Sequence, residues 1–66
     1  AGKLELQRLN AAIANLSAPL REVLLLRTVE GMTQAETAAA LAISGKAVET
    51  RLYRARTQLA EILAER

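Results

Sequence analysis

Four cationic side chains stand close together in the stretch ISGKAVETRLYRAR, residues 43–56. They are Lys46, Arg51, Arg54 and Arg56, and Glu49 is the one carboxylate among them. Lys and Arg can bind phosphate oxygens and donate to base edges, so this cluster suggests a polyanionic partner. Residues 1–43 carry equal numbers of basic and acidic side chains, so the net charge of +2 arises in the last third. The alternative is a solvated helix face with ordinary salt bridges.

Catalytic chemistry is poorly supported by the composition. The 66 residues contain no cysteine and no histidine, which removes the thiol nucleophile, the usual general base and the commonest metal ligands. The carboxylates occur singly, and no glycine-rich phosphate loop is present. We therefore expect no enzyme activity, no cofactor and no metal site.

The elements that position the cationic cluster are expected to be helices. Hydrophobic residues make up 52% of the chain but Tyr53 is the only aromatic one, so an aliphatic core must hold the domain together. Such a core suits packed helices, and we predict an all-α fold with four helices, no strands and hence no wing. Residues 1–66 would form one helical domain. Because the chain opens with Ala-Gly-Lys rather than Met, we expect it to be the C-terminal piece of a longer protein.

Periodicity and capping residues define the first two helices. The first is predicted from about Lys3 to Asn15, with one buried stripe. That stripe consists of Leu6, Leu9, Ile13 and Leu16. The Ser17 hydroxyl is expected to cap the second helix, with Pro19 in its first turn. Gly31 is expected at C′, in a positive-φ conformation.

A helix-turn-helix is predicted at about 33–59. Thr33 and Glu36 have the spacing of a capping box for a short helix from 34 to about 41. A three-residue turn, 42–44, would then lead to a fourth helix that Ser44 caps and that runs to about residue 64. This order of elements is typical of the helix-turn-helix motif.

The fourth helix has two faces at 100° per residue. The apolar stripe consists of Val48, Leu52, Ala55, Leu59 and Ile62, and the opposite face of Lys46, Thr50, Tyr53 and Thr57. Glu49 and Arg56 flank one side and Arg54 the other. Arg51 lies nearer the apolar edge, where it could instead pair with a glutamate such as Glu22 or Glu36.

A polar helix face of this kind suits the DNA major groove, which is about 12 Å wide and admits one α-helix. Lys and Arg can donate to guanine, Glu can accept from a cytosine amine, and Thr can do either or touch a thymine methyl. Free N–H groups at the first turn of a helix can also bind phosphate. Further candidate phosphate sites are therefore the start of the third helix, at Thr33–Gln34, and the start of the fourth, at Ser44, Gly45 and Lys46.

The segment LREVLLLRTVEGMTQAETAAALAISGKAVETRLYRARTQL, residues 20–59, resembles domain 4 of the extracytoplasmic-function (ECF) group of bacterial sigma-70 factors. The blocks REVLLLR, EGMTQAE, AAALAIS and AVETRLYRAR correspond in order and spacing to that family's pattern. LuxR-type helix-turn-helix domains share the first three blocks, whereas RLYRAR is the sigma-like ending.

The resemblance implies recognition of the promoter −35 element in double-stranded DNA, as part of RNA polymerase holoenzyme in the bacterial cytoplasm and nucleoid. By position, the family's recognition-helix contacts fall on Glu49, Thr50, Tyr53 and Arg54. The family's cations that bind the DNA backbone fall on Arg51 and Arg56. Lys46 lies in a variable first turn that often contributes to DNA binding in this family. It also implies docking on the β-subunit flap, and masking by an anti-sigma factor. Two alternatives remain: a LuxR-type response-regulator domain, or a sigma-like protein-interaction module without DNA affinity of its own.

Three positions depart from the family pattern. Glu49 stands where a basic residue is frequent, so the promoter sequence that is read can differ. Ala42 replaces the usual turn glycine, where a positive φ would cost free energy. Thr37 replaces the usual Ile, which places a hydroxyl in the core that needs a hydrogen-bond partner.

Overall fold

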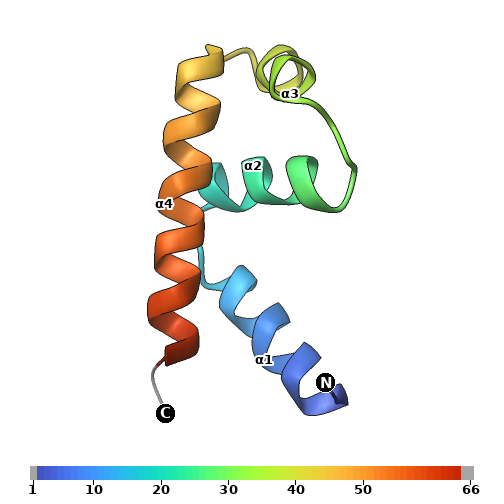
Figure 1. Cartoon of the computed structure of the whole chain (residues 1–66), viewed down its shortest axis with the longest axis vertical. Coiled ribbons are helices and arrows are strands. Elements are labelled where there is room, and N and C mark those ends of the chain that lie inside the picture. The colour runs from blue at the N-terminus through green and yellow to red at the C-terminus, as the bar shows by residue number, and fades with distance from the viewer. Residues whose placement is uncertain (1, 65–66) are drawn as a thin grey trace.

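The computed structural model describes residues 2–64, which form four α-helices and, within that range, no strand. They are α1 (Lys3–Ala14), α2 (Ala18–Thr28), α3 (Gln34–Leu41) and α4 (Gly45–Ala64). The long helix α4 forms one side of the molecule, with α3 beside its start, α2 crossing its middle and α1 near its end (Figure 1). The predicted all-α, four-helix fold is confirmed.

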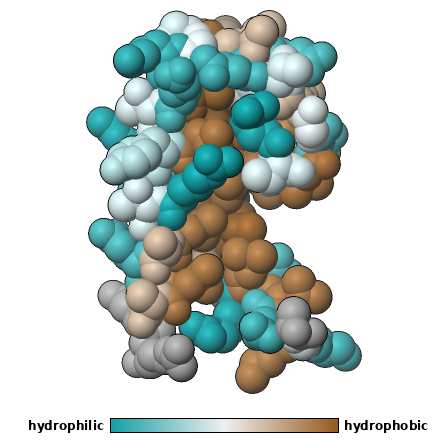
Figure 2. Space-filling model, viewed as in Figure 1, coloured by the Kyte–Doolittle hydropathy of each residue, from teal (hydrophilic) through white to brown (hydrophobic). Residues whose placement is uncertain are grey.

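An aliphatic core joins α2 and α4 to the end of α1. Its buried members are Leu16, Leu20, Leu24 and Ala55, with Ile13, Leu52 and Leu59 packed against them. In Figure 2 the hydrophobic residues gather where these three helices meet, and hydrophilic residues follow the outer edge of α4. The core thus holds one face of α4 and leaves its other face to solvent.

The buried stripe predicted along α1 is wrong over its first half. Leu16 is buried and Ile13 half-buried, but Leu6 is 59% and Leu9 is 38% exposed. The N-terminal half of α1 lies apart from α2 (Figure 1), so that these leucines have few neighbours to bury them. Periodicity identifies a face that favours burial, but it does not tell whether the covering surface belongs to the same chain.

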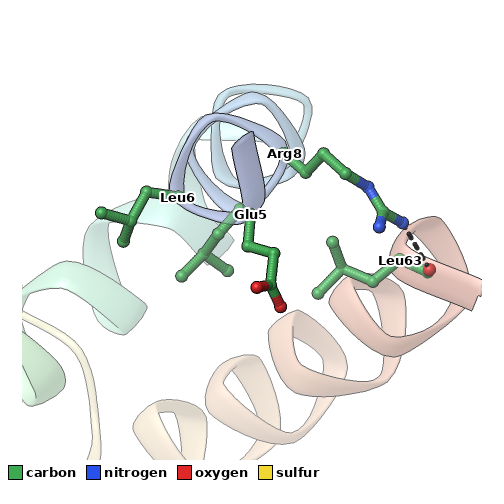
Figure 3. Close-up of a pocket in the computed structure, with 5 residues that line it drawn as sticks. Glu5, Leu6, Arg8 and Leu63 are labelled. Carbon is green, nitrogen blue, oxygen red and sulfur yellow. Dashed lines mark hydrogen bonds between the residues drawn. The ribbon is translucent and has the colours of Figure 1, made fainter. Parts of the chain in front are cut away.

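A cleft of about 380 Å³ lies between the start of α1 and the end of α4. Glu5, Leu6, Arg8, Leu9 and Leu63 line it. Arg8 reaches across and donates from Nη2 to the Leu63 carbonyl, at 3.0 Å (Figure 3). The guanidinium thereby satisfies a carbonyl of the last turn of α4, which has no partner within the helix.

Two details of the helix ends also differ from expectation. Ser17 is the N-cap of α2, but its hydroxyl makes no capping hydrogen bond. Because Pro19 occupies the second position of the helix, one of the two N–H groups that a cap hydroxyl normally binds is missing. Gly31 has the predicted positive φ of 69°, yet α2 ends at Thr28 with Val29 as its cap. Gly31 therefore lies one residue beyond C′.

Candidate nucleic-acid interface

The turn between α3 and α4 has the predicted length. Helix α3 ends at Leu41, and the next residue, Ala42, is left-handed with φ 57° and ψ 43°. The Ile43 N–H donates to the Ala38 carbonyl at 3.0 Å, which closes the end of α3. Ala42 therefore stands in the conformation that glycine favours, at a cost of about 1–2 kcal/mol for its Cβ.

The predicted cap of α4 is also confirmed. The Ala47 N–H donates to Ser44 Oγ at 3.0 Å, and the Val48 N–H donates to the Ser44 carbonyl at 3.1 Å. These bonds fix the first turn of α4, from which Lys46 projects with an exposed side chain.

A reciprocal capping box fixes the start of α3. The Glu36 N–H donates to Thr33 Oγ1 at 3.1 Å, and the Thr33 N–H donates to Glu36 Oε1 at 2.8 Å. One turn later the fully buried Thr37 donates its hydroxyl to the Thr33 carbonyl, at 2.9 Å. The Thr37 hydroxyl, which was expected to need a partner in the core, thus finds one within its own helix.

Helix α4 separates a core face from an exposed face, as the helical wheel predicted. Val48 and Ala55 are buried, and Leu52 and Leu59 are half-buried. The exposed candidates are Lys46, Glu49, Tyr53, Arg54 and Arg56. Tyr53 is 72% exposed, so its ring and hydroxyl are open to a partner. Thr50 and Arg51 are half-buried. By helical spacing Thr50 lies on the exposed face, between Lys46 and Arg54, and Arg51 lies nearer the apolar edge.

The arginines of α1 and α2 bind backbone carbonyls. Arg8 donates to Leu63, and Arg21 donates from Nη1 to the carbonyls of Ala14 and Leu16, at 3.3 and 3.0 Å. Arg27 donates from Nη1 to the Met32 carbonyl. These three guanidiniums close helix ends and loops, which explains their places in the sequence without any partner molecule.

The cations of α4 are used differently. Within residues 2–64, Lys46, Arg51, Arg54 and Arg56 make no hydrogen bond or ion pair. The alternative pairing of Arg51 with Glu22 or Glu36 is therefore not present. Four positive charges on one stretch of helix, each with free donors, form an electrostatic surface suited to phosphate.

One side chain at this surface was not singled out from the sequence. Gln34, the first residue of α3, donates from Nε2 to the carbonyl of Gly45, the first residue of α4, at 3.0 Å. From the sequence, Gln34 was predicted only as part of a possible phosphate site at the start of α3. No local pattern indicated that this amide reaches eleven residues along the chain, because the contact depends on the angle between the helices.

Other classes of site find no support in the part of the chain that the structure describes. It contains no group of three or more His, Cys, Asp or Glu residues placed to hold a metal ion. None of its helices combines the length and the apolar character that crossing a membrane requires.

Comparison with known proteins decides the family. The model of sigma-70, region 4, matches residues 6–59. This chain belongs to the sigma-70 region 4 family. The resemblance to domain 4 of ECF-type sigma factors is thereby confirmed, and the match favours a sigma factor over a LuxR-type response regulator. Region 4 is a DNA-binding domain of sigma factors, which accords with the exposed cations of α4.

Two curated relatives agree with this assignment. The RNA polymerase sigma factor CnrH of Cupriavidus metallidurans is 44% identical over 63 residues, which cover 96% of this chain and 33% of CnrH. The RNA polymerase sigma factor NccH of Alcaligenes xylosoxydans xylosoxydans is 39% identical over 61 residues, or 92% of this chain and 33% of NccH. The region 4 domain described here thus spans about a third of the length of these relatives.

Proposed function

We propose that this region 4 domain reads the −35 element of promoter DNA with the exposed face of α4 in the major groove. The observation that supports this proposal most strongly is the contrast among the cations. Arg8, Arg21 and Arg27 bind carbonyls of the domain itself, whereas the α4 cations make no hydrogen bond or ion pair with any residue from 2 to 64. A helix with a buried apolar face and a free cationic face has the form that major-groove readers use.

The side chains divide into two roles under this proposal. By helical spacing, Lys46, Thr50 and Tyr53 lie on one face of α4, with Glu49 on one side of that face and Arg54 on the other. These residues would meet base edges or the adjacent backbone. Arg51 and Arg56, together with the helix starts at Thr33 and at Ser44–Gly45, would bind phosphates, which fixes the register of the helix on the duplex.

Fluorescence anisotropy with labelled duplexes tests this proposal. A duplex selected by the domain from a randomised pool is compared with its scrambled version at increasing salt. We expect a log–log salt slope of about −2 to −4, because each neutralised phosphate contributes about −0.9 and four free cations are available. A flat salt response would show that the cationic face does not bind DNA.

We also propose that the domain docks on RNA polymerase, at the flap of the β subunit, and that an anti-sigma factor can occupy the same apolar surface. The supporting observation is the exposed leucine side of α1, where Leu6 is 59% and Leu9 is 38% exposed at the cleft to α4. Exposed leucines of this kind are typical of protein interaction sites. The residues proposed to meet DNA belong to the first part of α4, whereas these leucines belong to α1, so the two interactions use different side chains.

Binding to an isolated β-flap fragment by biolayer interferometry tests the docking. Leu6→Glu should weaken flap binding at least tenfold, because it places a charge in an apolar contact. Arg54→Ala is the matched control, and it should leave flap binding unchanged while it weakens DNA binding. If Leu6→Glu binds the flap as well as the unchanged domain does, the flap docks elsewhere.

A further inference from the structure

The starts of α3 and α4 are joined by one side-chain amide. Gln34 Nε2 lies 3.0 Å from the Gly45 carbonyl oxygen, and the donor comes from the first residue of α3. Gly45 is followed directly by Lys46, the first exposed cation of α4. The bond therefore acts at the point where the orientation of α4 relative to α3 is set.

Gly45 leaves the space that this amide occupies. A Cβ added to Gly45 would lie 3.0 Å from Gln34 Nε2, and its next neighbours are also atoms of the Gln34 side chain. Gly45 has no positive φ, so the backbone there does not require glycine. To admit a Cβ, the Gln34 amide would have to move by a few tenths of an ångström, so a glycine at this position suits the bond that Gln34 makes.

Helix α3 packs against α4 and α2, and Thr37 is its one buried residue within the described chain. Among residues 2–64, the bond from Gln34 to Gly45 is the one side-chain hydrogen bond that joins α3 to α4. Because a hydrogen bond is directional, it adds a restraint on the angle between the two helices that packing alone does not supply. Because Gln34 is exposed, its bond contributes little to global stability.

We infer that Gln34 and Gly45 form a positioning pair, which holds the start of α4 at the angle required for DNA binding. Gln34 acts through the Gly45 carbonyl and does not itself bind phosphate. This inference rests on the proposed function, since the bound duplex supplies the readout. Without the pair, α4 must be oriented on binding, and affinity falls although the contacting side chains are intact.

Four variants test the pair by anisotropy and thermal denaturation: Gln34→Ala, Gln34→Met, Gly45→Ala and the double variant Gln34→Ala/Gly45→Ala. Gln34→Met keeps the length of the side chain but cannot donate. Gly45→Ala displaces the amide from the other side, while alanine favours the helix more than glycine does. Each single variant should weaken DNA binding about threefold to tenfold, the size expected for one hydrogen bond.

The combination of readouts separates positioning from other roles. Gly45→Ala should keep or raise the melting temperature while it weakens DNA binding. If the pair served stability alone, the melting temperature and the affinity would fall together. The double variant should bind no more weakly than Gln34→Ala, because both changes remove the same bond. The salt slope should remain that of the unchanged domain.

Each contrary result has a distinct meaning. A salt slope that falls by about 0.9 in Gln34→Ala would identify Gln34 as a phosphate contact and overturn the positioning role. Additive losses in the double variant, or a Gly45→Ala variant with normal affinity, would overturn the pair while the proposed function stands. Absence of salt-dependent binding by the unchanged domain would overturn both.

Discussion

Tyr53 and Ala55 lie two residues apart on α4, and they point to opposite environments. Tyr53 is 72% exposed and Ala55 is fully buried in the core with Leu16, Leu20 and Leu24. One face of α4 thus packs in the core of the domain, and the other face presents polar side chains to solvent. Because the two faces use different side chains, substitutions can separate DNA binding from stability.

The exposed cations should affect DNA binding without affecting folding. Arg54→Ala and Lys46→Ala should each lower affinity for the selected duplex, with a loss of about 1–3 kcal/mol where a base contact is removed. The free energy of unfolding should change by less than about 0.5 kcal/mol, because both side chains are exposed and neither makes a hydrogen bond or ion pair within residues 2–64. Anisotropy and urea denaturation measure the two quantities.

Lys3→Ala is the matched control for these variants. It removes the same charge from an exposed site at the start of α1, far along the chain from α4. Its affinity for DNA should stay close to that of the unchanged domain. Equal losses for Lys3→Ala and Arg54→Ala would show that net charge matters and the α4 face does not.

Leucines on the two sides of the domain should differ sharply in their effect on stability. Leu24→Ala removes a buried core side chain and should cost about 2–5 kcal/mol, enough to unfold much of so small a domain. Leu4→Ala, on the exposed side of α1, should change stability by less than about 0.5 kcal/mol. Thermal denaturation followed by circular dichroism measures both, and comparable losses would contradict the core described here.

The left-handed turn residue offers a stabilising change. Ala42 has φ 57°, so Ala42→Gly should raise stability by about 0.5–1 kcal/mol, the left-handed penalty less the greater entropy of glycine in the unfolded chain. Ala39→Gly is the matched control within α3, and it should lower stability by about 1 kcal/mol. If both substitutions destabilise the domain, Ala42 does not adopt the left-handed conformation in solution.

The buried Thr37 hydroxyl should contribute little to stability. Its partner, the Thr33 carbonyl, also accepts from the Thr37 N–H at 2.9 Å, so Thr37→Val leaves no carbonyl without a donor. We expect unfolding free energy within about 1 kcal/mol of the original, measured by urea denaturation. Thr57→Val, at an exposed site of α4, controls for the change of residue type. A loss well beyond that size would mean that the hydroxyl has a further partner.

Local signals in the sequence sufficed to predict the helices and the two faces of α4. The Thr33–Glu36 box, the Ser44 cap and the apolar stripe through Val48 act within a few residues, so sequence spacing alone identifies them. The same is true of the exposed cations, because a helix with one buried stripe leaves the opposite side to solvent.

Features that depend on the angles between helices could not be predicted in the same way. The exposure of Leu6 follows from the direction in which α1 leaves the core, which periodicity does not encode. The bond from Gln34 to Gly45 likewise depends on how α3 meets α4. The missing hydroxyl bond of Ser17 was foreseeable, since Pro19 removes one of the two N–H groups available to it.

Amide chemical-shift mapping tests most directly whether the exposed face of α4 binds DNA. The ¹⁵N-labelled domain is titrated with the selected duplex at low salt, and shifts are recorded for every residue that can be assigned. We predict the largest changes from Ser44 to Thr57 and at the start of α3, with little change along α1. Changes concentrated on the leucine side of α1, with α4 unaffected, would contradict the account.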